Sequence, residues 1–209
     1  MAAMAAAAEQ GGAAGIRANT AVDIKAIKQR CSLPVIGLYK KIYPGSDVYI
    51  TPTFEEAKEI AEAGADFIAL DATNRERPDG VPLSGLLNRI RAELPGVMIV
   101  ADVSTYEEGV CAMELGVELV STTMSGYTPY SPQLDGPDIE LVRRLAELKR
   151  VPVLAEGRIW TIEDCLACMN AGAHAVVIGT AITRPQEITK RFVAAIGTAV
   201  PSFKEMVEE

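Results

Sequence analysis

The chain has 209 residues, of which 49% are hydrophobic and 23% charged, which fits one domain with a sizeable core. Its net charge of -8 argues against a nucleic-acid partner, because counterion release requires a basic surface. No apolar run approaches the roughly 18 residues that a membrane span needs, so no membrane partner is expected.

The four cysteines, Cys31, Cys111, Cys165 and Cys168, follow no spacing typical of a disulfide framework. We therefore expect reduced thiols and a cytoplasmic protein. Cys165 and Cys168 form a C-x-x-C pair within a helical pattern, which leaves a redox or metal role as the alternative to buried apolar side chains. No further Cys or His completes a zinc site, so we predict neither a metal nor a cofactor.

The chain opens on an alanine-rich segment that lacks the basic start of a signal peptide, and we predict a helix there. A sequence pattern then recurs along the chain: the end of a helix, a glycine and a short apolar run. Its aligned glycines are Gly12, Gly64, Gly116 and Gly172, each where a left-handed C-terminal residue is wanted. Their intervals of a little over fifty residues suit a pair of βα units.

Further apolar runs begin after Pro34, Pro95 and Pro152, and they read as parallel strands covered on both faces. The predicted strands lie near residues 14–18, 34–40, 67–71, 97–103, 118–123, 152–156 and 175–181. The predicted helices include residues 54–63, which follow Thr53 as the N-cap, and residues 105–115, 139–148 and 162–169. Strict alternation of strands and helices predicts an α/β fold with a parallel sheet.

A closed TIM barrel has eight strands, whereas seven can be read here. We therefore expect a TIM (β/α)8-type barrel that lacks its first strand, as one domain over residues 1–209 that is truncated at the amino terminus. Such a sheet has open edges.

Polar residues follow the predicted strands at the point where each apolar run turns into a loop. They are Arg17, Lys40, Asp71, Asp102, the pair Thr122 and Thr123, Glu156, and the pair Gly179 and Thr180. In a barrel the carboxyl ends of all strands meet at one face, where active sites form. A charged residue at one strand end is as often a solvated loop start, but seven strand ends together favour a site.

The last two units suggest where a phosphate binds. Gly157 and Arg158 follow one strand, and Gly179 and Thr180 follow the next, with Arg184 close behind. Barrels commonly bind phosphate here through loop N–H groups and a helix start, and glycine allows a close approach of the backbone. A tight turn without ligand is the alternative for Gly179. The only histidine, His174, precedes the last strand and so lies at the opposite face, which argues against a histidine-bound metal.

At these positions the chain resembles the N-acetylmannosamine-6-phosphate 2-epimerases. The similar segments run in order over most of the chain and comprise residues 15–18, 33–40, 49–53, 68–78, 101–109, 120–130, 156–159 and 179–185. Members of that family begin with a further strand, which is absent from this sequence. The resemblance implies interconversion of N-acetylmannosamine 6-phosphate and N-acetylglucosamine 6-phosphate in sialic acid breakdown.

The resemblance also implies roles for particular residues. Lys40 and Glu156 match the acid–base pair, while Arg17, Asp102 and Arg184 match positions that hold substrate. We add Asp71, Thr122, Thr123 and Tyr127 as substrate-binding residues, and Gly157, Arg158, Gly179 and Thr180 with Arg184 as the phosphate site.

The expected chemistry is removal of the C2 proton from the open-chain sugar, with Lys40 exchanging the proton and Glu156 positioning it or taking the second role. Two alternatives stay open: a Schiff-base aldolase that uses Lys40, and a sugar-phosphate-binding barrel whose catalysis is impaired by the missing strand. The partner expected is a small sugar phosphate, and a homodimer is compatible with the sequence.

Overall fold

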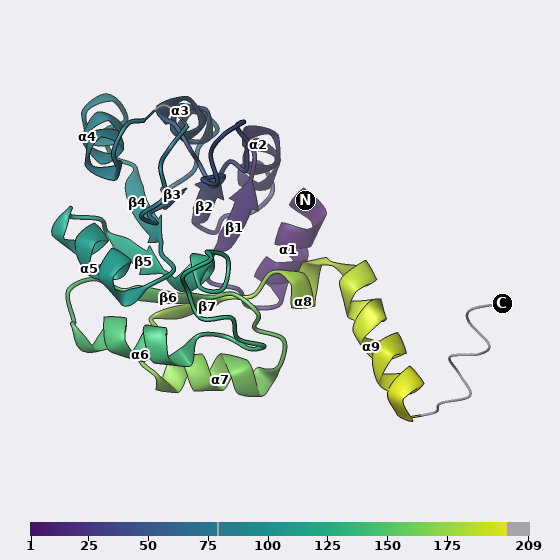
Figure 1. The fold of residues 1–209 in the computed structure, drawn as a ribbon. Helices are drawn as coiled ribbons and strands as arrows, with labels where there is room; N and C mark the ends of the chain where they lie inside the picture. Colours follow the sequence, from purple (N-terminus) through teal and green to yellow (C-terminus); the bar gives the residue numbers. More distant parts are fainter. Residues whose placement is uncertain (79, 200–209) are drawn as a thin grey trace.

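The computed structural model describes residues 1–78 and 80–199, which form a parallel sheet with helices around it (Figure 1). The strands are β1 Ile16–Asn19, β2 Val35–Leu38, β3 Phe67–Asp71, β4 Met98–Asp102, β5 Leu119–Ser121, β6 Val153–Glu156 and β7 Ala175–Val177. They pair in sequence order as one 7-stranded sheet, and every pair is parallel. The predicted TIM-type barrel with seven readable strands is therefore confirmed for the described residues.

The helices alternate with the strands and cover the outside of the sheet. They are α1 Ala2–Gln10, α2 Ala21–Lys28, α3 Phe54–Glu62, α4 Leu83–Glu93, α5 Tyr106–Glu114, α6 Ile139–Glu147, α7 Ile162–Asn170, α8 Thr180–Thr183 and α9 Pro185–Ala199, with a 3-10 turn η1 at Thr122–Met124. The helix predicted at the amino terminus is α1. No described helix has both the length and the apolar character needed to cross a membrane.

Local sequence signals account for where these helices begin and end. Thr53, predicted as an N-cap, closes a capping box with Glu56, and Thr105 and Thr161 do the same for α5 and α7. The four aligned glycines all adopt positive φ angles, between 77° and 99°. The recurring sequence pattern is thus a helix end followed by a left-handed glycine, as predicted.

The strand predicted at 97–103 ends one residue early, at Asp102, and three other predicted strands extend too far by two residues or more at their carboxyl ends. Residues 122–124 form η1, because the Thr122 hydroxyl bonds the backbone of Glu156 instead of continuing a ladder. Beyond β2, Lys40 forms only an isolated antiparallel bridge to Ile50. After β7 the chain turns at Gly179 and enters α8.

Side chains divide between two apolar regions according to the alternation of each strand. The inner cluster fills the barrel and includes Leu38, Ala69, Val100 and Leu154. Their strand neighbours point outward to the larger cluster under the helices. Because inward-facing positions recur every second residue, the residue two places beyond each inner apolar side chain reaches the carboxyl-terminal mouth of the barrel.

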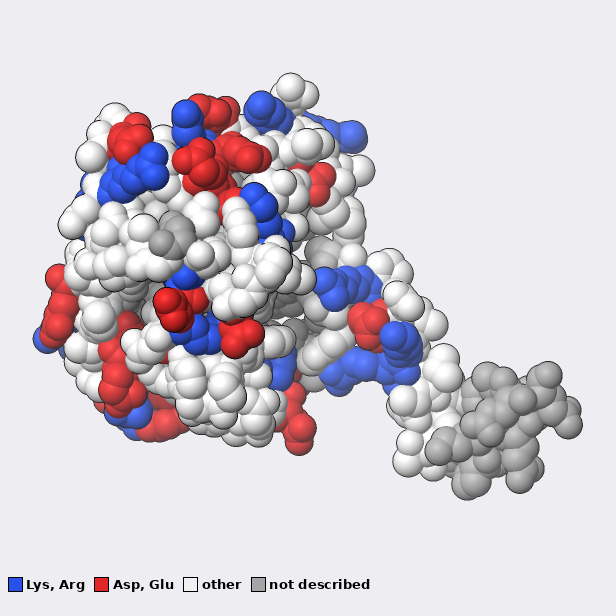
Figure 2. Space-filling model, turned by 45° about the horizontal axis from the view of Figure 1, so that its top comes forward, with Lys and Arg blue, Asp and Glu red and all other residues white. Residues whose placement is uncertain are grey.

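The last helix lies apart from the rest of the molecule. Figures 1 and 2 show α9 projecting from the body, with basic side chains on the part nearest the barrel. Its apolar residues Phe192, Val193 and Ile196 are 68%, 43% and 46% exposed. Strand β7, which precedes α8 and α9 in the chain, is only partly buried at all three positions, since among the described strands it pairs only with β6.

Candidate active site

The mouth of the barrel gathers polar side chains from five different strands or their ends. Arg17, Asp71, Asp102 and Glu156 occupy the inward-facing series of β1, β3, β4 and β6, and Lys40 lies two residues after the inner residue Leu38. The sheet register places Asp71 beside Asp102 and Asp102 beside Ser121. Parallel strands in register therefore bring the predicted residues to one place.

Arg17 is the centre of a buried ion cluster. Its Nη2 lies 2.6 Å from Asp102 Oδ2, and its Nε lies 3.2 Å from Glu156 Oε2. The Arg17 side chain is 8% exposed and that of Asp102 is 0% exposed, so both are screened from water. Burial disfavours the guanidinium charge, but the two carboxylates outweigh that effect and raise the pKa of Arg17 above its ordinary value.

One nitrogen of Arg17 has no partner. Among the described residues its Nη1 is the buried side-chain atom that makes no hydrogen bond. A buried donor left unpaired costs free energy, on the order of 1–3 kcal/mol. An oxygen of a bound molecule at the barrel mouth would accept this hydrogen bond.

Opposing effects act on the pKa of Glu156. Burial raises its pKa, the guanidinium of Arg17 opposes this effect, and the carboxylate of Asp102 adds to it. The charge of Lys40 lowers the same pKa to a smaller extent, which places the two predicted catalytic side chains within electrostatic reach of each other. The Glu156 side chain is 20% exposed, so it retains access to the open end of the barrel.

Threonine hydroxyls connect the two carboxylates. Thr123 Oγ1 lies 2.7 Å from Asp102 Oδ1 and 3.1 Å from Glu156 Oε2. Ser121 Oγ lies 2.8 Å from the same Thr123 oxygen. Thr122, in contrast, uses its hydroxyl on the backbone N–H and C=O of Glu156, so it fixes the end of β6.

Lys40 extends from the end of β2 into an open cleft of about 490 Å³, which is lined by Lys40, Ile42, Ser46, Asp47 and Tyr49. Its backbone N–H donates to Asn19 Oδ1 over 2.8 Å, which ties the lysine to the end of β1. The following loop is anchored by Lys41, whose ammonium lies 2.7 Å from the buried carboxylate of Glu56. The cleft volume lies in the range of small-molecule sites.

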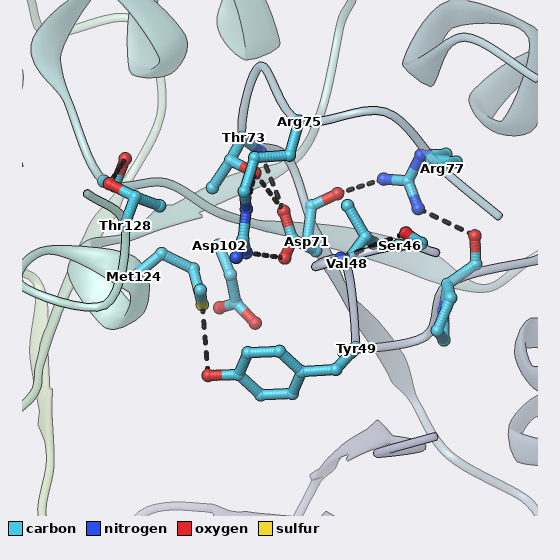
Figure 3. A network of polar contacts seen from close by, with 12 residues as sticks. Ser46, Val48, Tyr49, Asp71, Thr73, Arg75, Arg77, Asp102, Met124 and Thr128 are labelled. Carbon is cyan, nitrogen blue, oxygen red and sulfur yellow. Dashed lines mark hydrogen bonds and ion pairs between the residues drawn. The ribbon is translucent and has the colours of Figure 1, made fainter. Parts of the chain in front are cut away.

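Tyr49 and Arg75 form a second side of the mouth (Figure 3). The Tyr49 ring lies 6.0 Å from both the Lys40 ammonium and the Arg75 guanidinium. Arg75 donates to Asp71 Oδ2 over 2.6 Å, and Thr73 donates to Oδ1 of the same carboxyl. Burial raises the pKa of Asp71 against these donors. The structure thus shows Asp71 holding Arg75, while its predicted substrate contact stays a prediction.

Arg158 and Tyr127 both lie at the mouth. The Arg158 side chain is held by backbone carbonyls, whereas the Tyr127 side chain is largely exposed. Arg158 donates to the carbonyls of Ser125 and Gly136 over 2.7 and 2.9 Å, so it braces the loop after η1. Gly126 must be glycine there, because a Cβ atom would lie 2.4 Å from Arg158 Nη1 and its φ is +79°. Tyr127 is 53% exposed, with its ring centroid 5.7 Å from the Arg158 guanidinium.

The remaining predicted phosphate residues lie directly after β6 and along the segment from β7 into α9. Gly157 has a φ of 110° at the end of β6. The Gly179 carbonyl accepts hydrogen bonds from the backbone N–H groups of Ile182 and Thr183, which form the short helix α8 that begins at Thr180. Arg184 is exposed where α8 meets α9. No described contact tests phosphate binding, so this set also stays a prediction.

His174 immediately precedes β7, where its backbone N–H donates to the Val153 carbonyl, so it lies at the face opposite the site as predicted. Within residues 1–78 and 80–199, no group of three His, Cys, Asp or Glu side chains is arranged to hold a metal ion.

Three residues of the site were not singled out from the sequence: Tyr49, Arg75 and Ser121. Ser121 was detectable, because it stands two residues before Thr123 on an inward-facing strand position. Tyr49 was not, since its approach to Lys40 depends on how the loop after β2 folds back over the barrel.

A parallel barrel whose buried carboxylates, arginine and lysine meet at the carboxyl ends of its strands belongs to the class of TIM-barrel enzymes. Residues 1–198 match the family model NanE, described as "Putative N-acetylmannosamine-6-phosphate epimerase". The chain belongs to this family.

Individual relatives agree with this assignment. A "Putative N-acetylmannosamine-6-phosphate 2-epimerase" of Caldanaerobacter subterraneus is 57% identical over 94% of this chain and 83% of its own length. The protein of the same name from Clostridioides difficile is 50% identical over 92% and 86% of the two chains. The solved N-acetylmannosamine-6-phosphate 2-epimerase of Clostridium perfringens superposes with a TM-score of 0.89 at 47% identity, covering 93% of this chain and 84% of that one.

A more distant structure shares the fold alone. The thiamine phosphate pyrophosphorylase of Pyrococcus furiosus superposes with a TM-score of 0.62 at 17% identity, covering 90% of this chain and 84% of its own.

Proposed function

We propose that this protein interconverts N-acetylmannosamine 6-phosphate and N-acetylglucosamine 6-phosphate by removing and returning the proton on C2. The observation that carries the proposal is the buried cluster of Arg17, Asp102 and Glu156, with an unpartnered Arg17 N–H group and Lys40 close by. Family membership supports the choice of substrate.

The chemistry requires a base, an acid and positive charge near the developing enolate. In the open-chain sugar C1 is an aldehyde, so the neighbouring C2 proton becomes removable. Lys40 takes this proton from one face of C2. The Lys40 ammonium then returns a proton to the other face, which the enolate presents after rotation about its C2–C3 bond, and this gives the epimer. Arg17 stabilises the oxygen on C1 as negative charge develops there, using the N–H group that the protein leaves unpaired.

Asp102 holds Arg17 in place, and Glu156 supplies the second acid–base group. Tyr49 and Arg75 border the pocket from the side of Lys40. We assign substrate contacts to Asp71, Thr122, Thr123 and Tyr127. The phosphate is assigned to Gly157, Arg158, Gly179, Thr180 and Arg184, at the end of the barrel where other barrels bind this group.

Exchange of the C2 proton tests the reaction. The protein is incubated with N-acetylmannosamine 6-phosphate in heavy water, and C2 is followed by NMR. We expect the glucosamine epimer to form with deuterium at C2, and we expect Lys40→Met to lose exchange by at least about a thousandfold, the size of a general acid–base contribution. Lys58→Met is the matched control, because Lys58 is half exposed on α3 and pairs only with Glu62.

Two outcomes would contradict the proposal. Exchange retained in Lys40→Met would place the base elsewhere. Covalent trapping of the sugar on Lys40 by borohydride would show an imine, which is the aldolase reaction and not the epimerase reaction.

We further propose that the protein is a homodimer. Helix α9 carries exposed Phe192, Val193 and Ile196, and α7 exposes Ile162 and Leu166. A helix of 15 residues is marginal in water by itself, and apolar patches of this kind mark interaction sites. A second copy of the chain would cover these faces.

We also place the protein in the cytoplasm, acting in sialic acid breakdown as one domain without a nucleic-acid partner. The four cysteines lie within the described residues and none is paired there. A net charge of -8 disfavours nucleic acid.

A further inference from the structure

The hydroxyl of Thr123 is shared by more groups than its single proton can serve. Its oxygen lies 2.7 Å from Asp102 Oδ1, 3.1 Å from Glu156 Oε2 and 2.8 Å from Ser121 Oγ. A hydroxyl donates one hydrogen bond and accepts two. An ionised carboxylate only accepts. Two ionised carboxylates therefore cannot both be satisfied by Thr123.

The distances and burial indicate which carboxylate receives the proton of Thr123. The contact to Asp102 is shorter by 0.4 Å than the contact to Glu156, from 2.7 and 3.1 Å. The Asp102 side chain is 0% exposed, whereas that of Glu156 is 20% exposed. An unmet acceptor costs more where water cannot reach it, so Thr123 donates to Asp102.

The other hydrogen bonds of the Thr123 hydroxyl then follow from counting protons. Ser121 donates to one lone pair of Thr123, which leaves the second lone pair directed at Glu156 Oε2. A carboxylate oxygen there would face a lone pair, but a protonated Glu156 would donate into it. Every donor and acceptor around Thr123 is therefore paired only when the Glu156 carboxyl holds a proton.

We propose that Ser121 and Thr123 form a positioning pair that keeps the proton on Glu156, so that Glu156 enters the reaction as the acid. The proposal rests on the epimerase activity proposed above and assigns the acid role within it. As the enolate forms, the O–H bond of Glu156 breaks and a new O–H bond forms on the oxygen at C1. The resulting carboxylate lies beside Arg17. When the Lys40 ammonium reprotonates C2, the carbonyl at C1 re-forms and the proton on its oxygen returns to Glu156.

The charged and titratable groups around Glu156 come from β1, from the segment between β2 and α3, and from β4. Arg17 of β1 and Lys40 after β2 favour its ionised form, while Asp102 of β4 opposes it. Tyr49, whose charge would also act on Arg17, lies across the mouth. The Thr123 hydroxyl contacts the Glu156 carboxyl directly and can act either as donor or as acceptor, so its orientation decides between two opposite effects on the pKa of Glu156.

The test is a direct titration of Glu156 in the ligand-free protein. Glutamate is labelled with ¹³C at the side-chain carboxyl, Glu156→Gln identifies the resonance, and its shift is followed against pH. In Thr123→Val, which keeps the branched shape, we expect the pKa of Glu156 to fall by about one unit, equivalent to a tenfold change in proton affinity. Ser121→Ala should move it in the same direction by less, and Thr123→Ser should restore the native titration.

A rise in the pKa of Glu156 in Thr123→Val would show that Thr123 donates to Glu156, and it would overturn the proposal, as would no change. The pH dependence of epimerase activity provides a second measurement. The upper limb of the pH profile of kcat/KM should move to lower pH with the titration, and above that limb kcat/KM should fall about tenfold. Because the titration needs no substrate, failure of the epimerase assignment would leave that reading intact and would be recognised separately.

Discussion

At the scale of single residues, burial and charge act against each other in the site. Arg17 is buried and charged because two carboxylates lie within 2.6 and 3.2 Å of it. The same guanidinium cannot fully offset the burial of Glu156 next to Asp102, so the pKa of Glu156 stays above its usual value. Acid–base groups in active sites are commonly tuned in this way.

This raised pKa has a consequence for stability. A carboxyl whose pKa is higher in the folded than in the unfolded protein binds an extra proton in the folded state between the two pKa values. Stability therefore falls as the pH rises from the unfolded value, 4.5, through the folded one. Glu156→Gln cannot ionise and does not lose this contribution.

We therefore expect the melting temperature of Glu156→Gln, relative to the native protein, to increase with pH across that window and to level off above it. Thermal unfolding followed by circular dichroism at a series of pH values measures the difference. Asp71, which also has a raised pKa, is present in both proteins and cancels. A difference that did not depend on pH would contradict the raised pKa of Glu156.

At the scale of elements, close contact between helices and sheet depends on Gly37. It faces outward from β2, where an added Cβ atom would lie 2.3 Å from Ile60, 2.7 Å from Ala65 and 2.8 Å from Ile24. Ile60 belongs to α3, Ala65 to the segment after it, and Ile24 to α2. These elements therefore approach β2 more closely than any larger side chain would permit.

Gly37→Ala should destabilise the fold by about 1–3 kcal/mol, the usual cost of overpacking a core. Urea unfolding gives the change as a lower midpoint with an unchanged slope. Gly136→Ala is the control, because its added Cβ atom would approach only Asp164, at 4.0 Å, and should change stability by less than about 0.5 kcal/mol. Equal midpoints for the two variants would show that the contact at Gly37 is not limiting.

At the scale of the whole molecule, the described residues include large apolar side chains that lie exposed on the outer helices. Helices α7 and α9 both expose large apolar side chains, and α9 stands away from the body in Figure 1. The barrel mouth, in contrast, presents buried ionic groups. The proposed catalytic surface and the proposed dimer surface are therefore chemically distinct.

A charge placed in the exposed face of α9 should prevent self-association. We expect the native protein to elute with the mass of a dimer in light scattering coupled to size exclusion, and Phe192→Glu to give the mass of one chain at the same concentration. Val22→Glu, at an exposed position on α2 that is 78% accessible, should remain dimeric. A monomeric native protein would contradict the dimer.

The sequence by itself determined the order of strands and helices, the capping threonines such as Thr53, and the strand ends that carry Arg17, Lys40, Asp102 and Glu156. These features are local: capping chemistry, glycine conformation and apolar runs are set by neighbours in the chain. The convergence of those residues also followed, because parallel strands bring their carboxyl ends to one face.

Only the tertiary structure decided which side chains touch. Arg17 bridges the carboxyl groups of Asp102 and Glu156, and Thr123 stands between the same two groups. Arg158 donates to the carbonyls of Ser125 and Gly136. All these contacts depend on distances between 2.6 and 3.2 Å. Such distances arise from how strands twist and loops fold back, to which residues far apart in the chain all contribute. The raised pKa of Glu156 is a property of that assembled environment, because burial and neighbouring charge, and not the residue alone, set it.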